Sequence, residues 1–148
     1  MSIQVPVSLK NGHDAIRATL KRAMREPGRI GEAARGVAEI LDGHILREEK
    51  FALAPLGLLG ALARGEMPAE LAEAEHLTQR LKSELPQMME EHRRISAALR
   101  RLASDAEAEG KSEYVALAQE MIVHAHVEED VLYPAALLVG ECARRILA

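Results

Sequence analysis

Histidine is the residue type in this sequence with the clearest capacity for chemistry, because a neutral imidazole is a common metal ligand. Four of the six histidines are spaced symmetrically about sequences that break helices: His13, His44, His92 and His124. The midpoints between successive members fall at Pro27-Gly28, at Pro68 and beside Gly110. Residues equally far from the turn of a helical hairpin lie side by side. The spacing therefore predicts four imidazoles at one level of a helical bundle.

Two glutamates accompany these histidines. Glu48 follows His44 by four residues and Glu128 follows His124 by four, which places each carboxylate one helical turn along the same face. Like-charged carboxylates buried together are unfavourable unless they are protonated or bound to a cation. Four imidazoles and two carboxylates would suit about two divalent or trivalent ions, with open positions left for water, oxide, O2 or another small ligand. The predicted metal ligands are His13, His44, Glu48, His92, His124 and Glu128.

The ligand pattern occurs twice in the chain. The offset from His13 to His92 is 79 residues, and the corresponding offsets of the second histidines and of the glutamates are both 80. Repetition of residue types at matched offsets indicates two similar halves. We expect each ion to take two histidines, with both carboxylates bridging the pair of ions.

Helix-breaking sequences divide the chain into four stretches that would position these side chains. We predict helices over residues 8–25, 30–63, 68–108 and 112–147, joined by short turns, and hence an all-α, antiparallel up-down-up-down four-helix bundle. Gly65 and Gly110 are expected to end helices, Pro68 to lie in a first turn, and Ser112 to cap the last helix. Prolines within the predicted helices should kink or interrupt them: Pro55, Pro86 and Pro134.

The apolar pattern predicts which way the histidines point. At about 100° per residue, the helix face that carries His124 also carries Met121, Val131 and Leu138. The opposite face of that stretch carries His126 and Tyr133. Similar apolar faces surround the other three histidines. We therefore expect four inward imidazoles, with no aromatic or thiol group beside them on the inner faces.

Other polar residues near the predicted ligands have alternative interpretations. A two-residue error in the last turn would bring in His126 and Asp130, and this pair stays an alternative to His124 and Glu128. Glu49 and Glu129 each follow a predicted bridging carboxylate and are expected to be exposed, with support of the histidine ligands as the alternative. His76 is expected at the surface.

Composition excludes several classes of function. The 148 residues suit one domain, 1–148, and their 48% hydrophobic content can form a packed core. A formal net charge of −4 and only three aromatic residues argue against nucleic acid or an anionic membrane as the partner. The single cysteine, Cys142, excludes an internal disulfide. No apolar run is long enough to span a bilayer and no export signal is evident, so we expect a cytoplasmic protein.

The chain resembles the haemerythrin-like HHE cation-binding family. The resemblance rests on His44-Ile-Leu-Arg-Glu48-Glu49 and His124-Ala-His-Val-Glu128-Glu129, together with the lone His13 and His92, and it extends over roughly residues 9–140. It implies an antiparallel four-helix bundle with a non-haem di-iron centre that Glu48 and Glu128 bridge. Oxygen-carrying haemerythrins would have a second histidine four residues from His92. Met88 and Ser96 stand at those positions here.

Three functions fit these observations. The first is a di-iron protein that binds, senses or handles O2, NO, peroxide or iron itself, with manganese or zinc as alternative metals. The second is a di-iron oxidoreductase that decomposes peroxide. The third is a bundle in which the metal serves only to stabilise the fold. The ligand types alone do not separate an enzyme from a binding protein.

Overall fold

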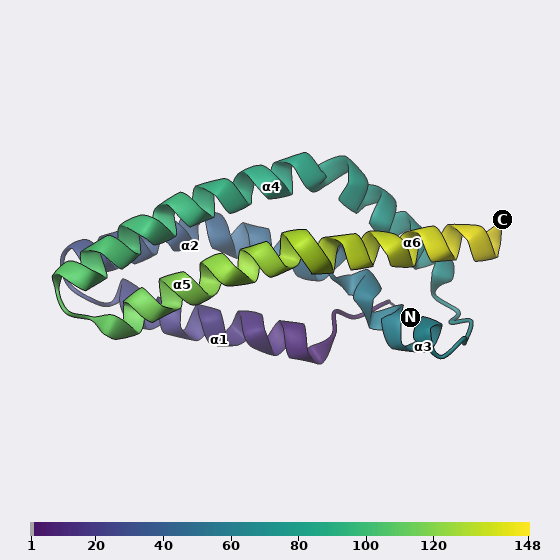
Figure 1. Ribbon diagram of the computed structural model, residues 1–148, viewed down its shortest axis with the longest axis horizontal. Helices are drawn as coiled ribbons and strands as arrows, with labels where there is room; N and C mark the ends of the chain where they lie inside the picture. The colour runs from purple at the N-terminus through teal and green to yellow at the C-terminus, as the bar shows by residue number, and fades with distance from the viewer. Residues whose placement is uncertain (1) are drawn as a thin grey trace.

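The computed structural model describes residues 2–148, and its regular elements are all helical (Figure 1). The prediction of an all-α chain is confirmed. In chain order the elements are α1 (Val7–Met24), α2 (Arg29–Arg47), the π-helix η1 (Glu48–Ala52), the 3-10 helix η2 (Ala54–Leu58), α3 (Leu59–Ala63), α4 (Leu71–Ala108), α5 (Ser112–Val127), the π-helix η3 (Glu128–Leu132) and α6 (Tyr133–Leu147).

These elements form four helical stretches close to the predicted ones. α1 packs against α2, α2 against α4, and α4 against both α5 and α6, while α1 also contacts α5 and so closes the arrangement. In Figure 1, α5, η3 and α6 run on as one rod, and α4 bends along its length. Pro86 lies inside α4, as predicted, and a proline within a helix is a usual cause of such a bend.

The three predicted turns each contain a glycine with positive φ: Gly28 at 71°, Gly65 at 78° and Gly110 at 70°. The end of α4 shows why a glycine is needed. The N–H groups of Gly110 and Lys111 donate to the carbonyls of Glu107 and Ala106, a closing pattern that requires left-handed backbone at Gly110.

Two predicted details at helix starts are wrong. Pro68 precedes α4, which begins only at Leu71 after a non-helical connection. Ser112 is the first residue of α5 rather than its cap, because Lys111 takes the flanking position and its carbonyl accepts the first helical hydrogen bonds. No side-chain hydrogen bond caps this helix.

The last predicted helix is interrupted by the π-helix η3. Its backbone bond runs from the Tyr133 N–H to the Glu128 carbonyl, five residues back instead of four. Such a turn contains one extra residue and rotates everything after it by about 100° relative to an unbroken α-helix. The second helical stretch contains an equivalent π-turn at η1, where the Leu53 N–H donates to the Glu48 carbonyl at 2.8 Å.

This rotation overturns part of the predicted inner face. Val131 and Leu138 were expected inside but are 56% and 66% exposed. Tyr133, Ala136 and Val139 are buried in their place, each at 1% or less. The prediction fails there because it continued α-helical spacing through the π-turn.

The apolar core is divided into clusters that flank the level of the histidines. One cluster reaches that level through Leu41, Ile95 and Met121. Another reaches it from the opposite side through Met88 and Tyr133. A layer of histidines and glutamates is therefore enclosed by hydrocarbon. Within residues 2–148, no helix has both the length and the apolar character needed to cross a membrane.

Candidate metal centre

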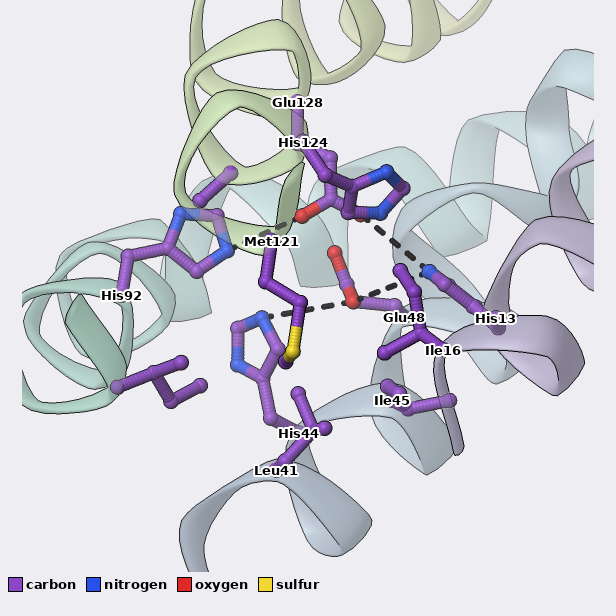
Figure 2. A pocket seen from close by; sticks show the side chains of 12 residues that line it. His13, Ile16, Leu41, His44, Ile45, Glu48, His92, Met121, His124 and Glu128 are labelled. Atoms are coloured by element: carbon purple, nitrogen blue, oxygen red, sulfur yellow. Dashed lines mark hydrogen bonds and ion pairs between the residues drawn. The ribbon is translucent and has the colours of Figure 1, made fainter. Parts of the chain in front are cut away.

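The six predicted ligands meet in the interior of the protein (Figure 2). They form two groups that share Glu128, and within each group the potential ligand atoms lie within 4.8 Å of one another. The first group is His44, Glu48, His92 and Glu128; the second is His13, His124 and Glu128. This buried cluster could hold a metal ion. In Figure 2 the two carboxylates lie between the histidines of the two groups.

Glu128 spans the two groups. Its Oε1 lies 3.2 Å from His92 Nε2 in the first group. Its Oε2 lies 3.1 Å from His124 Nε2 and 3.5 Å from His13 Nε2 in the second. One carboxylate oxygen thus faces each group, which is how a carboxylate that bridges two cations is oriented.

Glu48 occupies the corresponding position in the first half of the chain. Its Oε1 lies 3.5 Å from His44 Nε2 and 3.7 Å from His13 Nε2, so it also reaches both groups. Its side chain is 2% exposed. Burial and the charge of Glu128 raise the pKa of Glu48, although the nearby imidazole of His44 acts in the opposite direction.

Carboxylates outside the two groups lie near the far side of two of the imidazoles, and one of them forms a hydrogen bond there. Glu49 Oε2 lies 2.9 Å from His13 Nδ1, and Glu129 Oε1 lies 3.3 Å from His92 Nδ1 without hydrogen-bond geometry. The expectation that Glu49 and Glu129 are exposed is wrong, since their side chains are 16% and 20% exposed. A carboxylate at Nδ1 favours the tautomer that keeps the proton there and leaves Nε2 free to bind a cation.

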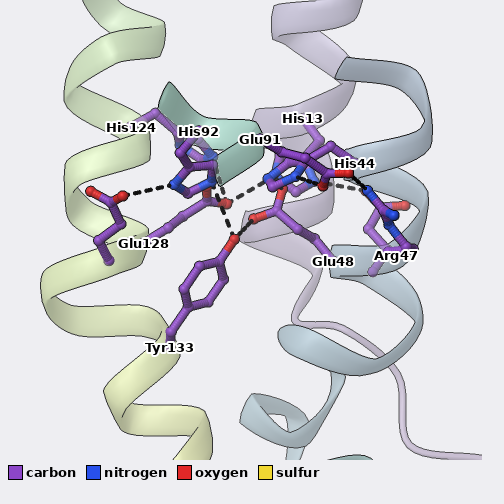
Figure 3. A network of polar contacts seen from close by, with 11 residues as sticks. His13, His44, Arg47, Glu48, Glu91, His92, His124, Glu128 and Tyr133 are labelled. Atoms are coloured by element: carbon purple, nitrogen blue, oxygen red, sulfur yellow. Dashed lines mark hydrogen bonds and ion pairs between the residues drawn. The ribbon is translucent and has the colours of Figure 1, made fainter. Parts of the chain in front are cut away.

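His44 has the most elaborate support of the four histidines (Figure 3). Its Nδ1 lies 2.8 Å from Glu91 Oε1, and Arg47 donates to the other oxygen of the same carboxylate. Burial by itself would raise the pKa of Glu91, but the contacts with His44 and Arg47 outweigh it and lower the pKa. Glu91 therefore remains a carboxylate beside His44. Sequence reasoning missed this residue.

Tyr133 is the second residue that sequence reasoning missed, and the prediction of no aromatic group beside the histidines is wrong. Its hydroxyl donates to Glu48 Oε2 at 2.6 Å and lies 3.3 Å from His92 Nε2 (Figure 3). Its ring stacks on that of His92 with centroids 5.7 Å apart. Continued α-helical spacing would place Tyr133 about 140° from Glu128, whereas the π-turn brings it to about 40°.

The unpaired nitrogens of the cluster fit a cation. His13 Nε2 and His44 Nε2 are buried and have no hydrogen-bond partner among residues 2–148. Burial lowers the pKa of His13, but the carboxylates of Glu128, Glu48 and Glu49 outweigh that and raise it to about 9. The buried acids therefore need positive charge beside them, from protons or from a metal ion. A metal ion would also provide the missing partner for both nitrogens.

The six candidate ligands themselves line a small cavity, together with hydrophobic side chains. Water-sized molecules can occupy about 20 Å³ of it, which is space for one or two such molecules. Six hydrophobic side chains contribute to its lining: Ile16, Leu41, Ile45, Ile95, Met121 and Ala125. The cavity is too small for a large substrate.

The competing histidines do not join the cluster. The side chain of His126 is 66% exposed and Asp130 is also exposed, so the alternative pair is wrong. His76 is exposed, as predicted. His124 does join the cluster but is not fully inside it, since 29% of its side chain is exposed.

A comparison of the chain with protein-family models, with curated proteins and with solved structures finds no match. The resemblance to the haemerythrin-like family therefore rests on the residues of the cluster and on their order in the chain.

Proposed function

We propose that this chain is a non-haem di-iron protein of the haemerythrin-like HHE type that binds, senses or handles O2, NO, peroxide or iron itself. One observation carries the proposal: six histidine and glutamate side chains converge at a buried point, where two imidazole nitrogens have no other partner. Most buried polar atoms in folded proteins have a hydrogen-bond partner, so the two unpaired nitrogens that face the cluster favour a bound cation.

The proposal includes an antiparallel up-down-up-down order of the four helical stretches. The contacts between histidines equally distant from each turn support this order. His13 and His44 both reach Glu48, and His92 and His124 both reach Glu128. Side chains 31 or 32 residues apart in the chain meet in this way when the helices that carry them run in opposite directions.

Two ions are proposed because Glu128 turns one oxygen to each group of histidines. Imidazole nitrogen and carboxylate oxygen suit iron, and they also suit manganese and zinc. Iron held by these residues would supply the capacity to bind small ligands and to change oxidation state. The small volume of the cavity that these residues line supports O2, NO or peroxide over any larger molecule.

Anaerobic loading with Fe(II), followed by metal analysis and admission of air, tests the proposal. We expect about two iron ions per chain and new absorption bands after air is admitted. His44→Ala should lower the iron content, whereas the same substitution at the exposed His76 should not. A purified protein that retains no iron under these conditions would refute the proposal.

A peroxide-decomposing oxidoreductase is the second candidate, and the position of Tyr133 favours it. A phenol in contact with the cluster is a group that can exchange an electron and a proton with a reaction intermediate, and Tyr133 has this position through Glu48 and His92. Steady-state rates of peroxide consumption decide the question. Rates no higher than those of an equal concentration of free iron would exclude this activity.

A further inference from the structure

We infer that the two metal positions are unequal: the position between His44 and His92 retains its ion, whereas the position between His13 and His124 exchanges its ion with solvent. This inference rests on the proposed function. It concerns which of this chain's residues stabilise each position, and three differences between equivalent residues support it.

The repeat in the chain makes the comparison possible. His13 corresponds to His92, His44 to His124, and Glu48 to Glu128, at offsets of 79 or 80 residues. The repeat therefore relates each residue at one metal position to an equivalent residue at the other. Four potential ligands cluster at the His44–His92 position, including both glutamates, but only three cluster at the His13–His124 position.

The first difference lies behind the histidines. Glu91 and Arg47 hold Nδ1 of His44. The residue equivalent to Glu91 is Gly12, because each directly precedes a histidine of the repeated pair. Within residues 2–148, no side chain hydrogen-bonds Nδ1 of His124. His124 therefore lacks the kind of carboxylate support that His44 has. At the other histidine of each position, Glu49 hydrogen-bonds His13 Nδ1, whereas Glu129 lies near His92 Nδ1 without hydrogen-bond geometry.

The second difference lies at the π-turns. Tyr133 directly follows η3 and places its hydroxyl 3.3 Å from His92 Nε2, at the His44–His92 position. The equivalent residue after η1 is Leu53, which is fully buried and offers no polar atom. An additional oxygen is therefore available to one position and not to the other.

The third difference is access to solvent. The side chain of His124 is 29% exposed, whereas those of His13, His44 and His92 are 1%, 2% and 4% exposed. Of the four histidines, His124 alone can turn away from the cluster without moving through the core. An ion held by His13 and His124 has the shorter path to water.

Release of metal to a chelator tests the inference. The full-length protein is loaded anaerobically with Fe(II) and mixed with an excess of a chromogenic ferrous chelator, and release is followed over time. We expect two phases of equal amplitude whose rate constants differ by about tenfold or more, because loss of one supporting carboxylate alone weakens metal binding by about 10–100-fold.

Two substitutions assign the phases. Gly12→Glu supplies the absent carboxylate, and a Cβ at this position meets no atom within 4 Å. It should slow the fast phase about tenfold and leave the slow phase unchanged. Gly12→Ala is the matched control, because it adds the Cβ without the carboxylate. The converse variant, Glu91→Ala, should accelerate the slow phase alone, and circular dichroism checks that each variant is folded.

The outcomes separate this inference from the proposed function. Two phases that respond separately to Gly12→Glu and Glu91→Ala support unequal positions. Release of both ions in one phase, or a fast phase that Glu91→Ala accelerates while Gly12→Glu has no effect, overturns the inference and leaves the di-iron proposal intact. A chain that binds no iron at all overturns both.

Discussion

The charges of individual residues explain why the buried cluster of histidines and glutamates needs a cation. Glu48 and Glu128 are both almost fully buried at the cluster. Burial by itself raises the pKa of Glu128, but contacts with His124, His13 and His92 outweigh this and lower it. The structure therefore keeps Glu128 ionised within hydrocarbon surroundings, and it does so by bringing imidazoles to it. A bound cation replaces the protons that those imidazoles would otherwise need to carry.

Tyr133 provides a prediction at the same scale. Burial and the nearby carboxylates of Glu48 and Glu128 raise its pKa, so the phenol is protonated when no cation is present. A cation reverses this effect and favours the phenolate. We expect the ferric protein to show a visible tyrosinate charge-transfer band that Tyr133→Phe removes while iron content stays the same. The matched control is Tyr114→Phe, since Tyr114 is buried but hydrogen-bonds Glu26 instead. A band that survives in Tyr133→Phe would contradict this role.

His124 and His126 provide a second prediction, because they are two residues apart but differ in their surroundings. His124 Nε2 lies 3.1 Å from Glu128, whereas the side chain of His126 is 66% exposed. We expect His124→Ala to reduce the bound iron from about two ions to about one, and His126→Ala to leave it unchanged. Metal analysis after gel filtration measures both. Equal losses in the two variants would show that the ligand has been misassigned.

At the scale of helices, the sequence predicts most of what positions the cluster. Turn glycines and apolar spacing predict the ends of all four helical stretches to within a few residues. The equal distances of the histidines from the turns predict that the six candidate ligands lie together. Their role as metal ligands stays a prediction. The π-turns are not predicted, because an extra residue in a helical turn is selected by packing after the turn rather than by local propensity. Glu91 is missed for a similar reason, since its contact with His44 is made across two helices and depends on where its side chain points.

The π-turn at η3 provides a prediction about deletions. Removing Val131 would turn η3 into an α-helical turn, with Tyr133 four residues after Glu128 instead of five and still on the same face. We expect this deletion to change the free energy of unfolding by less than about 2 kcal/mol. Val123 is similarly exposed, at 60% against 56% for Val131, but lies in regular α-helix. Its deletion rotates α5 before His124 by about 100° relative to the cluster.

Chemical denaturation and iron content compare the two deletion variants. The Val123 deletion should fail to fold or should lose iron, whereas the Val131 deletion should retain both its fold and its iron. Equal damage from the two deletions would mean that the extra residue of η3 is itself required by the structure.

At the scale of the whole molecule, the cluster links metal binding to stability and to pH. The pKa of His13 is about 9 in the folded chain without metal, above the ordinary value of 6.5. The stability that its protonation contributes is therefore complete below pH 6.5, and it is lost as the pH rises through about 9. The full effect is on the order of 3 kcal/mol. A bound cation must displace this proton, so metal affinity is expected to rise over the same range.

We therefore expect the metal-free protein to melt at progressively lower temperature between pH 6.5 and pH 9, while the metal-loaded protein changes much less. The difference in Tm between the two forms should widen with increasing pH, because loss of the proton weakens one form and favours metal binding in the other. Zn(II) should stabilise the chain as Fe(II) does, since the effect depends on charge and ligation rather than on redox chemistry. His13→Gln should reduce the pH dependence of the metal-free form, and the raised pKa of His44 should account for part of what remains. A Tm difference that stays constant or narrows over this range would show that the buried carboxylates do not depend on His13 for their compensating charge.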